Sequence, residues 1–341
     1  MKVLILKPSS LGDVVQALPV LRMLKRHRPD AEVYWWIDSH LAGLLEGDPD
    51  LDGLFLFDRR RWGSPGGLPS IIRGIREMRR HRFDWILDLQ ALARSGIVAW
   101  LAGGKVVAGL DDPREGAPAF YDLRVPRRSS ISHAVDWNVE LGAALGIPVR
   151  WDFDWLPARP AARAGIGRRW PVEGGRWILL QPGARWTNKR WPVGHFAALV
   201  RQLAVDLDPA VRFAVLGSAG ETHLAAEVCA AAPDRCISLA GETSLPEMVE
   251  WLRVASLLVT NDTGPMHVAA ALGRPVVAVY GPTSPHRTGP YGQVDRVLQL
   301  SLNCIPCLKS RCHHRPRIEC LTALSPERVA EAVHRRLAEA L

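Results

Sequence analysis

The first residues that could do chemistry lie in the loop Lys7-Pro8-Ser9-Ser10-Leu11-Gly12-Asp13. This loop follows the apolar run Val3-Leu4-Ile5-Leu6 and precedes an amphipathic helical pattern. It therefore falls at the carboxyl end of an expected strand, where α/β sheets bind their ligands. Gly12 permits a close approach of the backbone. The spacing leaves two interpretations of Asp13 open: a working carboxylate, or one that only complements the helix dipole, which is worth about 0.3–1 kcal/mol.

A second loop suits a phosphate group. The run Gln181-Pro182-Gly183-Ala184-Arg185-Trp186-Thr187-Asn188-Lys189-Arg190-Trp191-Pro192 combines a glycine, a hydroxyl, an amide and two adjacent cations ahead of a helical pattern. Backbone N–H groups and helix N-termini favour anions, and Lys189 adds a compact positive charge for a diphosphate. The alternative is a solvated basic loop. Trp186 and Trp191 argue against it, because two tryptophans beside the charges would be unusual on an idle surface.

A third loop joins an apolar run to a helix of small residues. It reads Thr260-Asn261-Asp262-Thr263-Gly264-Pro265-Met266-His267. Thr263 and Gly264 place N–H groups at the helix N-terminus, and Asp262 could accept hydrogen bonds from a ribose diol. His267 lies one turn further on. A lone histidine there is more often a hydrogen-bonded core residue than a catalyst.

The elements that must position these loops are short apolar runs alternating with helix-length amphipathic stretches. This alternation is typical of parallel strands joined by crossover helices. In the first half the expected strands are Val3-Leu6, Val33-Ile37, Leu54-Phe57, Trp85-Leu89 and Val106-Gly109. In the second half they are Trp177-Leu180, Val211-Leu216, Cys236-Leu239, Leu257-Thr260, Val276-Tyr280 and Val297-Leu300.

The two halves begin alike, each with a buried strand that runs into a proline-containing loop and a helical pattern. Between them the segment 148–175 holds Pro148, Pro157, Pro160 and Pro171 and no sustained periodicity, which indicates a linker. We therefore expect an α/β protein of two doubly wound parallel-sheet domains that face each other across a cleft. Their expected ranges are 1–160 and 161–325, followed by a helix at 326–341 that could pack back on the first domain.

Composition limits the class of protein. The chain has 341 residues, and 43 Lys and Arg against 35 Asp and Glu give a formal net charge of +8, which invites an anionic partner. No apolar run is long enough for the core of a signal peptide or for the ~20 residues that span a bilayer. A cytoplasmic protein is expected, with cysteines that are thiols or metal ligands rather than disulfides.

Four of the six cysteines are clustered. Cys304, Cys307, Cys312 and Cys320 follow a C-x2-C-x4-C-x7-C spacing, with histidines and arginines between them. This density suggests a structural zinc site or an iron–sulfur cluster, although only the first pair has a standard zinc-ligand spacing. Cysteines that only pack a loop are an equally open alternative. Cys229 and Cys236 are expected to be ordinary buried thiols.

Together the three loops resemble those of glycosyltransferase family 9, the ADP-heptose:lipopolysaccharide heptosyltransferases. The resemblance rests on K-P-S-S-L-G-D-V-V-Q-A-L-P, on P-G-A-R-W-T-N-K-R-W-P and on T-N-D-T-G-P-M-H-V-A-A-A-L-G-R-P-V-V-A-V-Y-G-P-T, supported by D-W-I-L-D-L-Q-A-L-A-R-S. It implies a GT-B fold, with the acceptor on the N-terminal Rossmann-like domain and the ADP-sugar on the other. It further implies an inverting transfer of L-glycero-D-manno-heptose from ADP-heptose to the inner core of lipopolysaccharide, without a required cofactor. The first motif is most similar to that of the first heptosyltransferase of the pathway.

The resemblance also implies roles for individual residues. Asp13 matches the general base and Lys189 the lysine that binds and stabilises the leaving diphosphate. The nucleotide-sugar site would comprise Ala184, Arg185, Thr187, Lys189, Glu221, Asp262, Thr263, Gly264, Pro265 and His267. The acceptor site, for Kdo-lipid A or a heptosylated core, would comprise Lys7, Ser9, Ser10, Gly12, Gln90 and Arg94. Ala184-Arg185 departs from the threonine pair of some relatives, and Arg185 is expected to take over a phosphate contact.

Positive charge in the first half has two interpretations. Arg59-Arg60-Arg61, Arg73, Arg76, Arg79, Arg80 and Arg82 could form a solvated face, or they could dock the protein on anionic lipid at the inner leaflet of the inner membrane. Two rival functions are open: a GT-B transferase with another nucleotide sugar or surface glycan, and a Cys/Arg-rich nucleic-acid-binding protein. The scattered basic residues and the phosphate-type loops argue against nucleic acid.

Overall fold

The computed structural model describes residues 1–58 and 67–339, which form two compact units, Met1–Pro157 and Ala158–Leu341. The division falls inside the proline-containing segment 148–175. Within that segment Pro160–Arg169 form helix α6, which the sequence analysis did not predict. Arg59, Arg60 and Arg61 lie outside the described residues. No helix in the described part of the chain is both long enough and apolar enough to cross a membrane.

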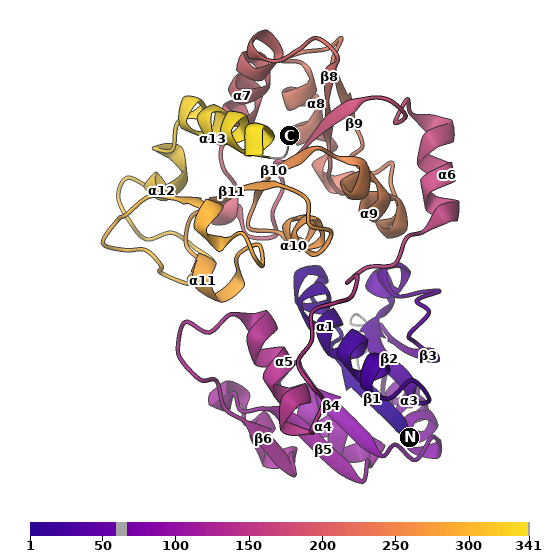
Figure 1. Cartoon of the computed structure of the whole chain (residues 1–341). Helices are drawn as coiled ribbons and strands as arrows, with labels where there is room; N and C mark the ends of the chain where they lie inside the picture. Colours follow the sequence, from indigo (N-terminus) through magenta and orange to yellow (C-terminus); the bar gives the residue numbers. More distant parts are fainter. Residues whose placement is uncertain (59–66, 340–341) are drawn as a thin grey trace. The chain divides into compact units, whose positions relative to one another are not determined.

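The first unit is built on one parallel sheet with the strand order β3-β2-β1-β4-β5-β6 (Figure 1). Strand order reverses beside β1, because β2 and β4 lie on its two sides. The strands are β1 (Lys2–Leu6), β2 (Glu32–Asp38), β3 (Gly53–Phe57), β4 (Trp85–Asp88), β5 (Val106–Leu110) and β6 (Leu123–Val125). The helices are α1 (Leu11–His27), α3 (Leu68–Arg80), α4 (Ala93–Ala102) and α5 (Ala134–Ala144).

The second unit repeats this plan with the strand order β12-β11-β10-β7-β8-β9, again parallel throughout. Here the order reverses beside β7. The strands are β7 (Arg176–Gln181), β8 (Val211–Val215), β9 (Cys236–Ser238), β10 (Leu257–Asn261), β11 (Val276–Tyr280) and β12 (Leu298–Gln299). The helices are α6, α7 (Val193–Asp206), α8 (Thr222–Cys229), α9 (Leu245–Val254), α10 (Gly264–Ala271), α11 (Pro285–Thr288), α12 (Glu319–Thr322) and α13 (Pro326–Glu339).

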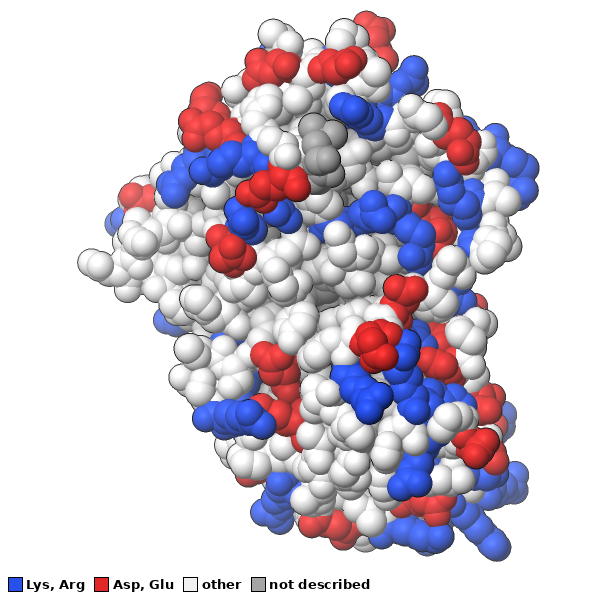
Figure 2. All heavy atoms as spheres, viewed as in Figure 1, with Lys and Arg blue, Asp and Glu red and all other residues white. Residues whose placement is uncertain are grey.

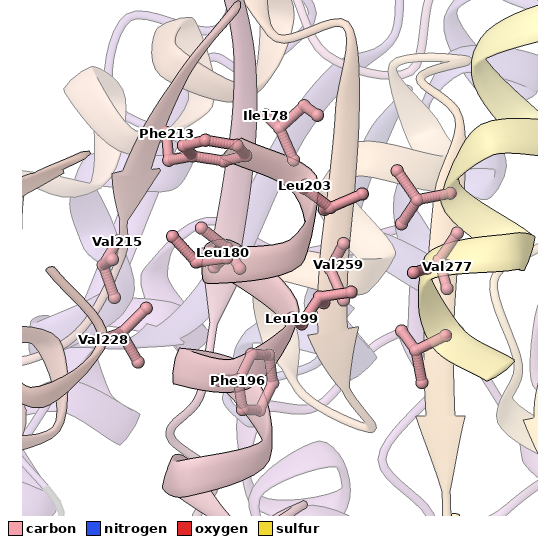
Figure 3. Packing of buried hydrophobic residues seen from close by; sticks show 14 of the residues in the cluster. Ile178, Leu180, Phe196, Leu199, Leu203, Phe213, Val215, Val228, Val259 and Val277 are labelled. Carbon is pink, nitrogen blue, oxygen red and sulfur yellow. The ribbon is translucent and has the colours of Figure 1, made fainter. Parts of the chain in front are cut away.

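The core of the second unit explains why its strands are nearly continuous apolar runs. Side chains from the central strands meet those of α7, as Figure 3 shows for Leu180, Phe196 and Leu199. Buried parallel strands need apolar residues on both faces, because helices cover both sides of the sheet. The same requirement holds for β1, where Val3 to Leu6 are fully buried.

The C-terminal helix belongs to the core of the second unit. Val329 and Val333 of α13 are fully buried in the same cluster as the α7 side chains, and α13 contacts α7, β10 and β11. Figure 1 shows α13 beside α7. The prediction of an amphipathic helix is confirmed, and its apolar face packs on its own unit.

The predicted fold class is confirmed. Every predicted strand is present, with ends that differ by at most one residue. The strand that the sequence analysis missed, β6, has only three residues, and Arg124 interrupts its apolar character. On the face shown in Figure 2, basic and acidic side chains are interspersed.

Candidate functional site

In the first unit the candidate residues follow β1 and β4, the two strands at which the order of the sheet reverses. Crevices at such switch points, outside the carboxyl ends of the strands, are where doubly wound sheets bind ligands. Lys7, Ser9 and Ser10 follow β1, and Gln90 follows β4. The structure thus brings the two predicted acceptor segments to one edge of the sheet, although 80 residues separate them in the chain.

Asp13 is fixed by Ser10. The backbone N–H of Ser10 donates to Asp13 Oδ2 at 2.8 Å and its hydroxyl donates to the same oxygen at 2.6 Å. Asp13 also lies in the first turn of α1, where the helix dipole stabilises negative charge. The capping function that spacing alone suggested is therefore real. It does not exclude a chemical role, because a carboxylate held in one orientation is also what a base requires.

Lys7 is buried beside this carboxylate. Its Nζ donates to the backbone carbonyl of Leu89 at the end of β4. Burial lowers the pKa of Lys7, and the negative charges of Asp13 and Asp88 act in the opposite direction. The ammonium group therefore joins the loops after β1 and β4 and supplies positive charge to the same edge of the sheet.

Asp88 is a site residue that the sequence analysis did not single out. It is fully buried at the end of β4, and its carboxylate accepts from the hydroxyl of Tyr121 at 2.7 Å and from the backbone N–H groups of Gln90 and Ala91 at 2.9 and 3.1 Å. Burial raises the pKa of Asp88, although these hydrogen bonds oppose the shift. Asp88 therefore shapes the turn that presents Gln90.

The side chain of Gln90 has an unsatisfied hydrogen-bond acceptor. Among the described residues its Oε1 is buried and has no hydrogen-bond partner. Buried polar atoms are normally paired, so a bound donor group at this position would remove an energetic cost. Arg94, predicted for the same site, is exposed in the first turn of α4.

In the second unit the candidate residues follow β7 and β10, again the two strands at the switch point. Lys189 Nζ lies 2.6 Å from Asp262 Oδ2, and the two side chains are 19% and 7% exposed. Trp186 flanks the ammonium group, with its ring centroid 4.9 Å from Nζ. The sequence analysis assigned Lys189 to a diphosphate and Asp262 to a ribose. The structure adds that the two side chains are paired with each other.

Asn261 holds the two loops together. Its Oδ1 accepts from the backbone N–H of Trp191 at 2.9 Å, and its Nδ2 donates to the carbonyl of Pro182 at 2.8 Å. Trp191 is 1% exposed, and its indole N–H donates to the carbonyl of Leu324 at 2.9 Å. This burial agrees with the expectation that the tryptophan does not lie on a solvated surface. Trp191 is a core residue that anchors the end of the loop.

A third strand end contributes to this site. After β11, the hydroxyl of Thr283 donates to Asp262 Oδ2 at 2.6 Å, so this oxygen receives both a cation and a hydroxyl. Tyr280 is fully buried beside Asp262, and burial together with that negative charge raises its pKa well above its usual range. These contacts fix the carboxylate at the edge of the sheet.

Helix α10 begins next to Asp262. Thr263 is its N-cap, Gly264 its first residue, and both are half-buried. The first-turn N–H groups of a helix have no intrahelical acceptor, so they offer donors to an anion. Pro265 lies in this first turn, where its missing N–H costs nothing. His267, at 9% exposed, is a buried residue of the second turn.

The loop after β7 approaches the turn after β8. A Cβ atom at Gly183 would lie 2.0 Å from Glu221 Oε1. Glu221 in turn accepts from the N–H and the hydroxyl of Ser218 at 2.9 Å each. The backbone at Gly183 can come this close to Glu221 only because it carries no side chain. Of the neighbouring predicted residues, Ala184 is buried, whereas Arg185 and Thr187 are exposed.

The cysteine segment also packs in the second unit. Cys304, Cys307, Cys312 and Cys320 line one cavity of about 270 Å³, and all are free thiols. Burial and the three neighbouring thiols raise the pKa of Cys320 to about 11. In the described part of the chain, no three Cys, His, Asp or Glu side chains are grouped so as to hold a metal ion as they stand. Away from this cluster, Cys229 and Cys236 lie 3.4 Å apart, Sγ to Sγ.

Comparison with known protein families gives a match over most of the chain. The sequence model of glycosyltransferase family 9 (heptosyltransferase) matches residues 71–317. Two similar parallel-sheet units, each with polar residues at its switch point, agree with that match. The chain belongs to glycosyltransferase family 9.

Particular relatives cover almost the whole chain. Lipopolysaccharide heptosyltransferase 1 of Pseudomonas aeruginosa is 30% identical over 97% of this chain and 96% of its own length. The solved structure of ADP-heptose lps heptosyltransferase II of E. coli is 25% identical with a TM-score of 0.78, covering 99% of both chains. That of E. coli heptosyltransferase WaaC with ADP is 26% identical with a TM-score of 0.76, covering 100% of both.

Proposed function

We propose that this protein is an inverting heptosyltransferase that moves L-glycero-D-manno-heptose from ADP-heptose to the Kdo-bearing inner core of lipopolysaccharide. The observation that carries the proposal is the chemical difference between the two switch points. The first presents an oriented carboxylate, Asp13, and the second a cation at a helix N-terminus, Lys189 beside α10. Relatives named as lipopolysaccharide heptosyltransferases support the substrate class.

The second unit, in this proposal, binds the ADP part of the donor. The diphosphate would lie on Lys189 and the N–H groups that open α10, because fixed donors and a point charge suit phosphate oxygens. Asp262 would pass from its pairing with Lys189 to the ribose diol or share the lysine with the diphosphate. The name of a solved relative, a heptosyltransferase with ADP, supports this ligand.

The first unit, in this proposal, binds the acceptor and supplies the base. Asp13 would remove the proton of an acceptor hydroxyl as that oxygen attacks the anomeric carbon of the heptose. The new carbon–oxygen bond forms on the face opposite the leaving ADP, which inverts the configuration. Lys7 and Gln90 would position the acceptor, since the first carries positive charge at this edge and the second an unpaired oxygen.

Leaving-group departure needs stabilisation of negative charge. As the bond between the anomeric carbon and the phosphate oxygen breaks, the electron pair goes to ADP. Lys189 and the α10 N–H groups would stabilise this charge without reorganising. Electrostatic stabilisation by such fixed groups is usually the largest single contribution to catalysis. No step in this scheme requires a metal ion.

The direct test is transfer in vitro. Purified protein, ADP-heptose and Kdo-bearing lipid A should give a product heavier by one heptose in mass spectrometry, and ADP should be released in equal amount. A panel of ADP-, UDP- and GDP-sugars fixes the donor, and a heptosylated acceptor fixes the position in the core. Release of ADP without heptosylated lipid, with every acceptor of this class, would refute the acceptor assignment.

We also propose that α3 and α4 contact the anionic inner leaflet from the cytoplasmic side, where the lipid acceptor would be found. On α3, Leu68 and Ile72 are 58% and 39% exposed; on α4, Trp100 is 61% exposed. Arg76, Arg79 and Arg80 of α3 are exposed as well, and Arg79 Nη1 donates to the carbonyl of Leu101 at the end of α4. Exposed aromatic and aliphatic groups among arginines suit the interface of an anionic bilayer.

A further inference from the structure

The cysteine segment is ordered without a core of its own. None of residues 301–320 is buried, and before Glu319 they form neither helix nor strand. Two residues that carry a Cβ, Leu308 and Ile318, hold left-handed backbone angles, φ +54° and +50°. Ordering such a chain costs conformational entropy, which buried apolar surface offsets elsewhere in the molecule. Segments that lack this surface are usually held by a crosslink or a metal ion.

The cavity enclosed by the segment has the donor chemistry of a soft-metal site. Its wall includes the four thiols of Cys304, Cys307, Cys312 and Cys320. Thiolates are the ligands that zinc and related ions prefer, and four of them complete a tetrahedral shell. Since the thiols do not converge as they stand, binding requires their side chains to turn inward, and the cavity of about 270 Å³ leaves room for this.

The cavity also holds a buried polar atom that has no hydrogen-bond partner among the described residues. Asn188 lines the same cavity and is 5% exposed, and its Oδ1 is buried with no hydrogen-bond partner among the described residues. A buried acceptor without a donor is costly. An ion held by four thiolates would fill only part of the cavity, and an ordered water beside it would donate to this oxygen.

The cavity is also connected to the phosphate loop. The other half of the same amide, Asn188 Nδ2, donates to the carbonyl of Lys309 at 2.8 Å. Leu308 N–H donates to the carbonyl of Pro282 at 2.8 Å, and Pro282 is followed by Thr283, which holds Asp262. Asn188 is the neighbour of Lys189 in the chain, so the cysteine segment supports both partners of the Lys189–Asp262 pair.

We propose that Cys304, Cys307, Cys312 and Cys320 bind one thiophilic divalent cation of the zinc class, and that this ion fixes the Lys309 carbonyl that positions Asn188 and the lysine loop. The metal site stands independently of the proposed reaction. Its effect on ADP binding rests on the proposed function of the second unit.

The first experiment counts metal and thiols. Protein purified without chelator should contain one zinc or iron per chain by mass spectrometry of the elements, and its intact mass should show no disulfide. Cys312→Ser should lower the metal content at least tenfold, whereas the matched control Cys229→Ser, a thiol outside the cluster, should retain it. Metal-free protein with four reactive thiols, disulfides among the four, or several irons with acid-labile sulfide would each overturn the proposal.

The second experiment measures the connection to the phosphate loop. Stripping the metal from the wild-type chain with a chelator should weaken ADP binding several-fold by calorimetry, and added zinc should restore it. This comparison does not depend on whether a cysteine variant folds. Asn188→Ala should keep its metal and show the same loss of ADP affinity. If the metal count is one but ADP affinity is unchanged by stripping, the positioning role is overturned; if no form binds ADP, the proposed function fails while the metal site stands.

Discussion

Lys189 and Asp262 form an ion pair of 2.6 Å between two loops that follow neighbouring strands, β7 and β10. The same Asp262 oxygen also accepts from Thr283, which follows β11. Three strand ends thus meet on one carboxylate oxygen. A cation that is already held at the edge of the sheet loses less side-chain entropy when a diphosphate arrives than a free surface lysine would.

The first prediction concerns Lys189. Lys189→Ala should weaken ADP binding tenfold or more, about 1.4 kcal/mol, because the diphosphate loses a point charge and Asp262 is left as an uncompensated negative charge beside it. Isothermal calorimetry with ADP measures the effect. Arg201→Ala, which removes an exposed cation from α7, is the control and should bind ADP like the wild type. Equal affinities for the two variants would sink the phosphate assignment.

Asp13→Asn should abolish transfer and leave ADP affinity near that of the wild type. Asparagine keeps the size of the side chain but cannot accept a proton, and a general base typically contributes about 10²–10⁴-fold to the rate. Initial rates of heptose transfer, with calorimetry for ADP, separate the two effects. A variant that keeps more than about a tenth of the rate removes Asp13 from this role.

Ser10→Ala tests whether orientation of that carboxylate matters. It removes the 2.6 Å hydroxyl bond and keeps the backbone bond to Asp13. The expected result is a partial loss of rate together with about 0.5–2 kcal/mol of stability, since Ser10 caps α1. A loss of stability of this size without any loss of rate would instead assign this hydrogen bond to helix capping alone.

The sequence was sufficient to predict every strand except β6, although it did not predict α6. Buried parallel strands such as β1 and β7 are apolar on both faces, so their runs are visible without knowledge of the fold. Residues that follow neighbouring parallel strands meet at one edge of the sheet. The position of the three loops at the carboxyl ends of their strands could therefore also be predicted.

The individual contacts could not be predicted from the sequence. Lys189 and Asp262 are 73 residues apart, and nothing in their own loops shows that they touch. Asp88 and Tyr121 are 33 residues apart, and their contact depends on β4 and β5 being neighbours and on Gly109, where a Cβ would lie 2.3 Å from the tyrosine ring.

Asp88 predicts a pH dependence of stability. Its pKa is raised by burial above the ordinary 3.8. At a pH between 3.8 and the raised pKa, the folded chain keeps a proton on Asp88 that the unfolded chain has released. The free energy of unfolding therefore falls as the pH rises through this window. Asp88→Asn removes the titrating group, and its free energy of unfolding should fall less between pH 4 and 7 in urea melts. Parallel curves for the two proteins would contradict the argument.

Gly183→Ala tests the close approach of the phosphate loop to Glu221. The added Cβ would lie 2.0 Å from Glu221 Oε1, so this carboxylate must turn away and lose its bonds to Ser218. We expect a loss of about 1–2 kcal/mol of stability, the usual cost of a lost cap, with weaker ADP binding. Gly194→Ala is the matched control, because a Cβ there meets only Glu227 Oε1 at 3.9 Å. Equal melting temperatures for the two variants would show that the close approach of Gly183 to Glu221 does not contribute to stability.

Contact of α3 and α4 with lipid predicts binding that depends on both charge and apolar surface. Anionic vesicles should bind the wild type at low salt and release it as salt rises, because exposed arginines contribute about 1 kcal/mol each near such a surface. Arg76→Glu should weaken binding at low salt and make its salt dependence shallower, because one attractive charge is replaced by a repulsive one. Trp100→Ser should weaken binding at every salt concentration. Val205→Ser is the control, since this valine is 83% exposed on α7 in the other unit. Co-sedimentation with vesicles measures all three, and equal binding of Trp100→Ser and Val205→Ser would assign the exposed tryptophan no part in membrane contact.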